Sequence, residues 1–240
     1  MNIVIVHLGT LPEILASTSI IKVLNKKFNN PNITFILKED KAKDIFAFNK
    51  KIKTFFIHDL PDDILRGRIF DLLINLHPSY YSDTLIKFNE AIGFNYSPNS
   101  DYLYNIMYGE NKSNNNLFQI YYSLLGLKWN GEGYDFCYFP KSRSKKERIG
   151  IAVSSAFLRT YVKKSLRKDL WVIPFKQNLL KQADEVNKCG TIITDNLLIC
   201  NLAIALRKHV YFLKIIPMNY NIEFFGNGQY FEVPIELLQK

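Results

Sequence analysis

Residues that can bind or move a proton gather just after the first apolar run of the chain, NIVIVH at 2–7, which predicts a buried strand. His7 ends this run, Thr10 lies in the loop that follows, and Glu13 lies in the first turn of a helix that Pro12 is suited to begin. Parallel α/β sheets bind ligands beyond the carboxyl ends of their strands, so these side chains would face a cleft. There Glu13 can accept a proton from a hydroxyl, or it can merely complement the helix dipole.

A second histidine follows a later apolar run. The run at 70–76 predicts another strand, and His77, Pro78 and Ser79 come directly after it. Histidine titrates near neutral pH, so His77 can bind an anion or shuttle a proton. It can equally well hydrogen-bond a loop, and both alternatives stay open.

Cations gather in the second half of the chain, after an apolar run at 149–153. They are Arg159, Lys163, Lys164, Arg167 and Lys168. A bound diphosphate needs such cations, although the same residues also suit a solvated loop. After a further run at 191–194, Asp195 and Asn196 can cap the helix expected at 197–206.

These residues must be held by a framework of alternating strands and helices. Strands are expected at 2–7, 32–37, 52–57, 70–76, 149–153, 170–173, 191–194 and 210–213. Helices are expected at 12–28, 42–48, 62–68, 82–90, 115–125, 179–187 and 197–206. A long polar loop is expected at 99–116, and no regular element after Asn219. Strands that alternate with helices predict an α/β fold with parallel sheets.

The best domain boundary is the charged segment PKSRSKKE at 140–147, which has no apolar residue after its proline. We therefore expect a first lobe at 1–140, a hinge at 141–147 and a smaller second lobe at 148–240.

Composition narrows the classes of partner and compartment. The 240 residues carry a formal net charge of +9, which favours anionic partners unless it only reflects a lysine-rich composition. Cys137, Cys189 and Cys200 lack the spacing of a disulfide framework or a metal site, so we expect buried thiols in a reducing compartment. No apolar run approaches the ~18 residues of a membrane span, and no signal peptide is evident. We expect a soluble protein, peripheral to a membrane at most.

The order of segments resembles glycosyltransferase family 9, the bacterial lipopolysaccharide heptosyltransferases. The stretch 7–14 is similar to the family's loop R-x-S-S-x-G-D-V, and FDLLINLHPS at 70–79 is similar to its D-L-V-I-D-L-H-G-S. Weaker similarities lie at 15–24, 32–37, 91–94, 116–127 and 149–154. The stretch 194–210 aligns without gaps with T-N-D-S-G-L-M-H-L-A-A-A-L-G-K-P-V.

This resemblance implies a GT-B-like fold of two Rossmann-like lobes, with the second lobe shortened. It implies an acceptor site in the first lobe, with Glu13 as the catalytic base and His7, Thr10, His77 and Ser79 in the cleft. It implies that the second lobe binds a nucleotide sugar, most simply an ADP-linked one. The residues expected at that donor site are Lys164, Lys168, Asp195, Asn196 and Asn201.

The same resemblance implies an inverting reaction that needs no metal and no cofactor. The acceptor would be a lipopolysaccharide core or another glycan, lipid-linked or not, and the location would be the cytoplasm, with peripheral contact at the anionic face of a bacterial inner membrane. Nucleic acid is not expected as a partner, because no nucleic-acid motif occurs.

Several family positions are changed, and they keep a second hypothesis open. His7 stands at the family's arginine position, Asn196 at its aspartate, Leu198 at its glycine and Asn201 at its histidine. A leucine obstructs the backbone approach that a glycine allows. The alternative is therefore a catalytically inactive relative that keeps the fold as a binding or assembly module.

Overall fold

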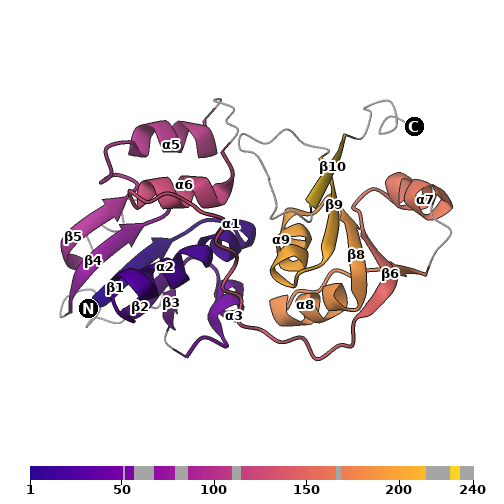
Figure 1. Ribbon diagram of the computed structural model, residues 1–240, viewed down its shortest axis with the longest axis horizontal. Coiled ribbons are helices and arrows are strands. Elements are labelled where there is room, and N and C mark those ends of the chain that lie inside the picture. The colour runs from indigo at the N-terminus through magenta and orange to yellow at the C-terminus, as the bar shows by residue number, and fades with distance from the viewer. Residues whose placement is uncertain are drawn as a thin grey trace. The chain divides into compact units, whose positions relative to one another are not determined.

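The computed structural model describes residues 1–50, 52–56, 68–78, 86–109, 115–165, 169–214 and 228–232. Described residues up to Cys137 form one compact unit, and those from Tyr138 onward form a second (Figure 1). Among the described residues, no helix is both long and apolar enough to span a membrane.

The first unit is built on a sheet of five parallel strands in the order β3-β2-β1-β4-β5. The strands are β1 (Asn2–His7), β2 (Asn32–Leu37), β3 (Ile52–Phe56), β4 (Ile69–Asn75) and β5 (Lys87–Gly93). The central strand β1 pairs with β2 on one side and with β4 on the other, so that His7 lies opposite Leu37, and Val6 opposite Asn75. The carboxyl ends of three strands therefore meet at one edge.

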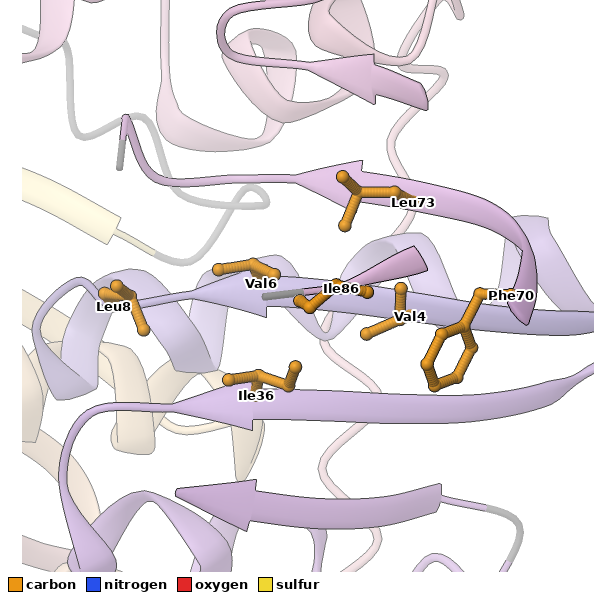
Figure 2. Close-up of a cluster of buried hydrophobic side chains, with 7 residues drawn as sticks. All are labelled: Val4, Val6, Leu8, Ile36, Phe70, Leu73 and Ile86. Carbon is orange, nitrogen blue, oxygen red and sulfur yellow. The ribbon is translucent and has the colours of Figure 1, made fainter. Parts of the chain in front are cut away.

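Both faces of this sheet are buried, which explains the continuous apolar sequence of β1. On one face, side chains from three strands and their flanking residues form a hydrophobic cluster (Figure 2). It consists of Val4, Val6, Leu8, Ile36, Phe70, Leu73 and Ile86. Because successive side chains of a strand alternate, Ile3, Ile5 and His7 point to the opposite face.

The helices of the first unit are α1 (Leu11–Ser17), α2 (Ser19–Lys27), α3 (Lys43–Phe46), α5 (Ser100–Met107) and α6 (Leu117–Leu124), with a 3₁₀ turn at Asp40–Ala42. The single helix expected at 12–28 is divided at Thr18. The Thr18 hydroxyl donates to the carbonyl oxygen of Leu15 at 2.7 Å and accepts the backbone N–H of Asp135 at 3.0 Å. Hydroxyl bonds of this kind to the preceding turn bend helices.

The second unit has its own sheet of five parallel strands, in the order β10-β9-β8-β6-β7. The strands are β6 (Lys145–Ala152), β7 (Leu170–Val172), β8 (Cys189–Thr194), β9 (His209–Lys214) and β10 (Gly228–Glu232). The helices are α7 (Ala156–Ser165), α8 (Leu179–Asn187) and α9 (Leu197–Ala205). Leu158 of α7 packs against Ile151 and Val153, while α9 packs against β8, β9 and α8.

Three expectations about local structure are wrong. The helix expected at 82–90 is replaced, over its described part, by strand β5, an edge strand whose polar, half-exposed residues do not alternate clearly. The loop expected at 99–116 contains α5, because Leu103, Ile106 and Met107 give it a buried face. The tail after Asn219 contributes β10. The helix expected at 62–68 falls almost wholly outside the described residues.

The segment expected to be a hinge is partly regular structure, because β6 begins at Lys145. Along the chain, the change from the first unit to the second falls between Cys137 and Tyr138. The proposed lobe boundaries and the shortening of the second lobe stay predictions.

Candidate active site

The loop after β1 is fixed by the carboxylate of Glu13. Thr10 has extended backbone angles and caps α1, and Pro12 lies in the first turn. The Oε2 atom of Glu13 accepts the backbone N–H of Thr10 at 2.6 Å and its hydroxyl at 2.8 Å. Glu13 therefore satisfies a donor at the helix start, as the acidic member of a capping box does. With 8% of its surface exposed, Glu13 reaches solvent only slightly.

Gly9 allows this close packing. A Cβ atom at this position would lie 2.6 Å from Oε2 of Glu13 and 2.8 Å from Cε1 of His7. Both distances are shorter than carbon atoms tolerate in proteins. A larger residue at this position would therefore force the side chains of His7 and Glu13 to shift.

His7 is fully buried and takes part in a chain of hydrogen bonds. Its Nδ1 atom accepts the backbone N–H of Gly9 at 3.2 Å, so the ring proton lies on Nε2. Nε2 is 3.1 Å from the hydroxyl oxygen of Tyr121, to which it donates. The Tyr121 hydroxyl in turn donates to the backbone carbonyl of Glu13 at 3.3 Å. His7 and Tyr121 thus hold both ends of the loop that carries Thr10.

Burial determines the charge of His7. Desolvation, reinforced by the nearby His77, lowers the pKa of His7 to about 3, although a backbone hydrogen bond to Glu13 opposes the shift. His7 is therefore neutral at physiological pH. It supports the site from beneath and does not offer a charge to an anion.

His77 lies two residues beyond the end of β4 and is half-buried. Desolvation lowers its pKa; the negative charge of Glu13 opposes this shift, and the positive charge of Lys38 adds to it. Lys38 follows β2, Glu13 follows β1 and His77 follows β4. The structure thus brings Thr10, Glu13 and His77 together at the carboxyl edge of the first sheet, above the buried His7. Ser79 lies outside the described residues.

In the second unit, Asp195 joins the ends of two neighbouring strands. Both of its carboxylate oxygens lie 3.0 Å from the backbone nitrogen of Ser154, and Oδ2 also accepts the Ser154 hydroxyl. Ser154 follows β6, and Asp195 follows β8. Asp195 therefore shapes the carboxyl edge of the second sheet.

Asn196 and Asn201 make hydrogen bonds within α9. The side-chain oxygen of Asn196 accepts the backbone N–H of Ile199 at 3.0 Å, which is the geometry of an N-cap. The Nδ2 atom of Asn201 donates to the carbonyl oxygen of Leu197 at 2.9 Å, and Asn201 is buried.

The basic residues after β6 lie on a helix. Arg159 donates from Nη2 to the carbonyl oxygen of Val153 at 2.9 Å, which ties α7 to the end of the strand. Lys163 and Lys164 occupy the last turn of α7 and are exposed. Lys168 and Arg167 lie outside the described residues. Within the parts of the chain that the structure describes, no group of three or more His, Cys, Asp or Glu side chains could hold a metal ion.

Sequence analysis missed Tyr121 and Ser154. Tyr121 belongs to α6 and lies 114 residues from His7, and Ser154 lies 41 residues from Asp195. Ser154 becomes a neighbour of Asp195 because β6 pairs with β8, and Tyr121 becomes a neighbour of His7 because α6 packs in the first unit against α1. No local pattern in the sequence marks either residue.

Comparison with solved structures gives matches over almost the whole chain. Heptosyltransferase WaaC of E. coli, with ADP-2-deoxy-2-fluoro heptose, is 11% identical with a TM-score of 0.62, over 98% of this chain and 94% of that chain. E. coli ADP-heptose LPS heptosyltransferase II is 10% identical with a TM-score of 0.66, over 97% and 91%. A family 9 glycosyltransferase of Veillonella parvula is 14% identical with a TM-score of 0.63, over 97% and 86%.

The chain has a GT-B-like fold. This confirms the fold class expected from the sequence, and each unit contains one parallel sheet. The sequence itself matches no protein-family model and no curated protein.

Proposed function

We propose that this chain is a heptosyltransferase-like glycosyltransferase that moves a sugar from an ADP-linked donor to a lipopolysaccharide-core or other glycan acceptor. The observation that carries the proposal is a carboxylate, Glu13, held at the carboxyl edge of the first sheet in this fold. The similar structures support the choice of donor, since one of them contains ADP-2-deoxy-2-fluoro heptose and another contains ADP.

Glu13 is the proposed general base. As the acceptor oxygen forms its bond to the anomeric carbon, the bond from that carbon to the diphosphate oxygen breaks, and Glu13 takes the proton of the acceptor hydroxyl. Attack from the face opposite the leaving group inverts the anomeric centre. Thr10 orients the carboxylate, and His77 would contact the acceptor.

The second unit is the proposed donor site. Lys164 and Lys168 would offset the negative charge that develops on the leaving diphosphate. Asp195 would act by holding Ser154, and Asn196 by ordering the start of α9, at the edge where the donor is expected. Asn201, buried within α9, supports this helix and is not expected to contact the sugar.

Calorimetric titration of the purified chain with ADP and with ADP-heptose tests the proposal. Saturable binding in the micromolar range is expected. The absence of binding to these ligands and to other nucleotide sugars would refute a transferase function and favour a non-catalytic binding or assembly module.

The role of Glu13 is tested by the pair Glu13→Gln and Glu13→Ala. Glutamine keeps an oxygen that can accept the Thr10 N–H but cannot take up a proton, whereas alanine loses both properties. We expect Glu13→Gln to bind ADP like the wild type and to lower ADP release in the presence of core-glycan acceptors by roughly 10²–10⁴-fold. Normal turnover by Glu13→Gln would show that Glu13 only caps the helix.

A further inference from the structure

Helix α5 turns tyrosine side chains away from the core on one face. Leu103, Ile106 and Met107 are its buried apolar residues, whereas Tyr104 is 43% exposed and Tyr108, directly after the helix, is 37% exposed. The backbone N–H of Tyr108 bonds to the carbonyl oxygen of Tyr104 at 2.8 Å, so the last turn continues to Tyr108. Residues four apart on a helix lie on the same face, so the two tyrosines are neighbours.

These tyrosines continue a row of aromatic rings that begins at His77. The ring centroids of His77 and Tyr108 are 5.6 Å apart with an edge-to-face angle of 66°, and those of Tyr108 and Tyr104 are 5.5 Å apart at 45°. The buried Phe94 supports Tyr108 at 6.3 Å. Such spacings are those of aromatic rings in contact. We call His77, Tyr108 and Tyr104 the aromatic row.

The inner end of the row belongs to the candidate active site. His77 follows β4 at the carboxyl edge of the first sheet and is close enough to Glu13 and Lys38 for their charges to act on it. The outer end lies on α5, which packs against α6 in the same unit (Figure 1). The row therefore runs from His77, which lies near the proposed base, to exposed tyrosines at the end of α5.

We propose that the aromatic row binds a sugar ring of the glycan acceptor, and this proposal rests on the function proposed above. A pyranose has a face of C–H groups and a rim of hydroxyls. A tyrosine side chain matches it, because its ring is apolar and its hydroxyl can donate and accept hydrogen bonds. The rings of the row meet at 66° and 45°, so each tyrosine presents its own ring face to a sugar. Because the rings already hold one another by contact before the sugar arrives, the entropic cost of binding is lowered.

The row can be tested with variants of its outer member. Tyr104→Leu keeps the apolar bulk but removes the flat ring, whereas Tyr104→Phe keeps the ring. Tyr102 provides a matched control, since it lies on the same helix and is 60% exposed. Residues two apart on a helix do not face the same way, so Tyr102→Leu should leave the row intact.

The experiment is saturation-transfer NMR on the full chain with three probes: methyl α-D-mannopyranoside, methyl α-D-glucopyranoside and methyl β-D-galactopyranoside. We expect saturation of the ring C–H protons of at least one probe. Tyr104→Leu should weaken the apparent affinity by about fivefold or more. Tyr104→Phe should weaken the affinity less than Tyr104→Leu, because it loses only the hydroxyl and keeps the ring, and Tyr102→Leu should bind like the wild type. No transfer to any probe, or equal affinity in Tyr104→Leu, would overturn the proposal.

Titration of the same variants with ADP separates this proposal from the one on which it rests. ADP binding is expected to be unchanged in each variant, because the proposed donor site lies in the other unit. Sugar binding that depends on Tyr104 in a chain that binds no nucleotide would sustain the aromatic row and refute the transferase. Nucleotide binding without sugar binding would refute the aromatic row alone.

Discussion

Replacing Tyr121 with phenylalanine should destabilise the first unit more than the loss of an ordinary hydroxyl does. The change removes the acceptor of the His7 Nε2–H, which is fully buried, and also the donor to the carbonyl oxygen of Glu13. A buried polar group without a partner costs about 1–3 kcal/mol, so we expect a loss of about 2 kcal/mol in the free energy of unfolding.

The matched control is Tyr122→Phe, the next residue of the same helix. Tyr122 is also buried, and its hydroxyl donates to the carbonyl oxygen of Ser19 at 3.1 Å. This change leaves no buried N–H without an acceptor, so it should cost only about 1 kcal/mol. Both variants keep the ring, so packing is the same in the comparison.

Urea unfolding followed by circular dichroism measures the two changes, with the midpoint shifted and the slope unchanged if only stability is affected. A double-mutant cycle with His7→Leu should give a coupling of about 1 kcal/mol or more between His7 and Tyr121, as groups in one hydrogen-bond network do. If Tyr121→Phe and Tyr122→Phe lose the same stability and the cycle shows no coupling, the hydrogen-bond chain does not exist in solution.

Three further changes test the electrostatics and packing of both sites. The pKa of His7 is about 3 in the folded chain and 6.5 in the unfolded chain, so the unfolded chain binds more protons between these values. The free energy of unfolding should therefore fall by about 2 kcal/mol as the pH is lowered from 6.5 to 5. In urea titrations across this range, His7→Gln should flatten the pH dependence, and an unchanged slope would contradict a buried neutral His7. Gly9→Ala should cost about 1–3 kcal/mol in a thermal melt, because the new Cβ meets Glu13 and His7, whereas Gly133→Ala, with open space around it, should be neutral. Asp195→Ala should speed hydrogen exchange of the Ser154 amide by about tenfold, and unchanged protection would show that Asp195 does not hold this loop.

The inner strands can be predicted from the sequence because both of their faces are buried, so nearly every residue in them is apolar. β1 and β2 are buried along nearly their whole length, so their sequences are continuous β-branched and aromatic runs. The edge strand β5 is half-exposed, and its lysine, asparagine and glutamate conceal the strand period. Helix α5 was missed because a polar, tyrosine-rich composition outweighed its three buried apolar residues.

The candidate site shows the same limit. Thr10 and Glu13 are three residues apart, so their contact follows from the local geometry of a helix start and could be anticipated. His7 was expected in an open cleft, but it points to a buried face because of its place in the alternation of β1. Its partner Tyr121 comes from a helix that packs on that face only in the folded unit.

The position of Glu13 carries two roles that make opposite demands. A helix cap benefits from a carboxylate held against Thr10, whereas a base must be able to exchange that contact for an acceptor hydroxyl. The two bonds from Thr10 leave Glu13 slightly exposed, and the hydroxyl of Thr10, unlike its N–H, can rotate to another partner. Removing only that hydroxyl with Thr10→Val should therefore keep the backbone cap while freeing part of the carboxylate. If turnover survives in this variant, the backbone bond alone is sufficient to orient Glu13. If turnover is lost while the thermal melt is unchanged, both bonds from Thr10 are needed.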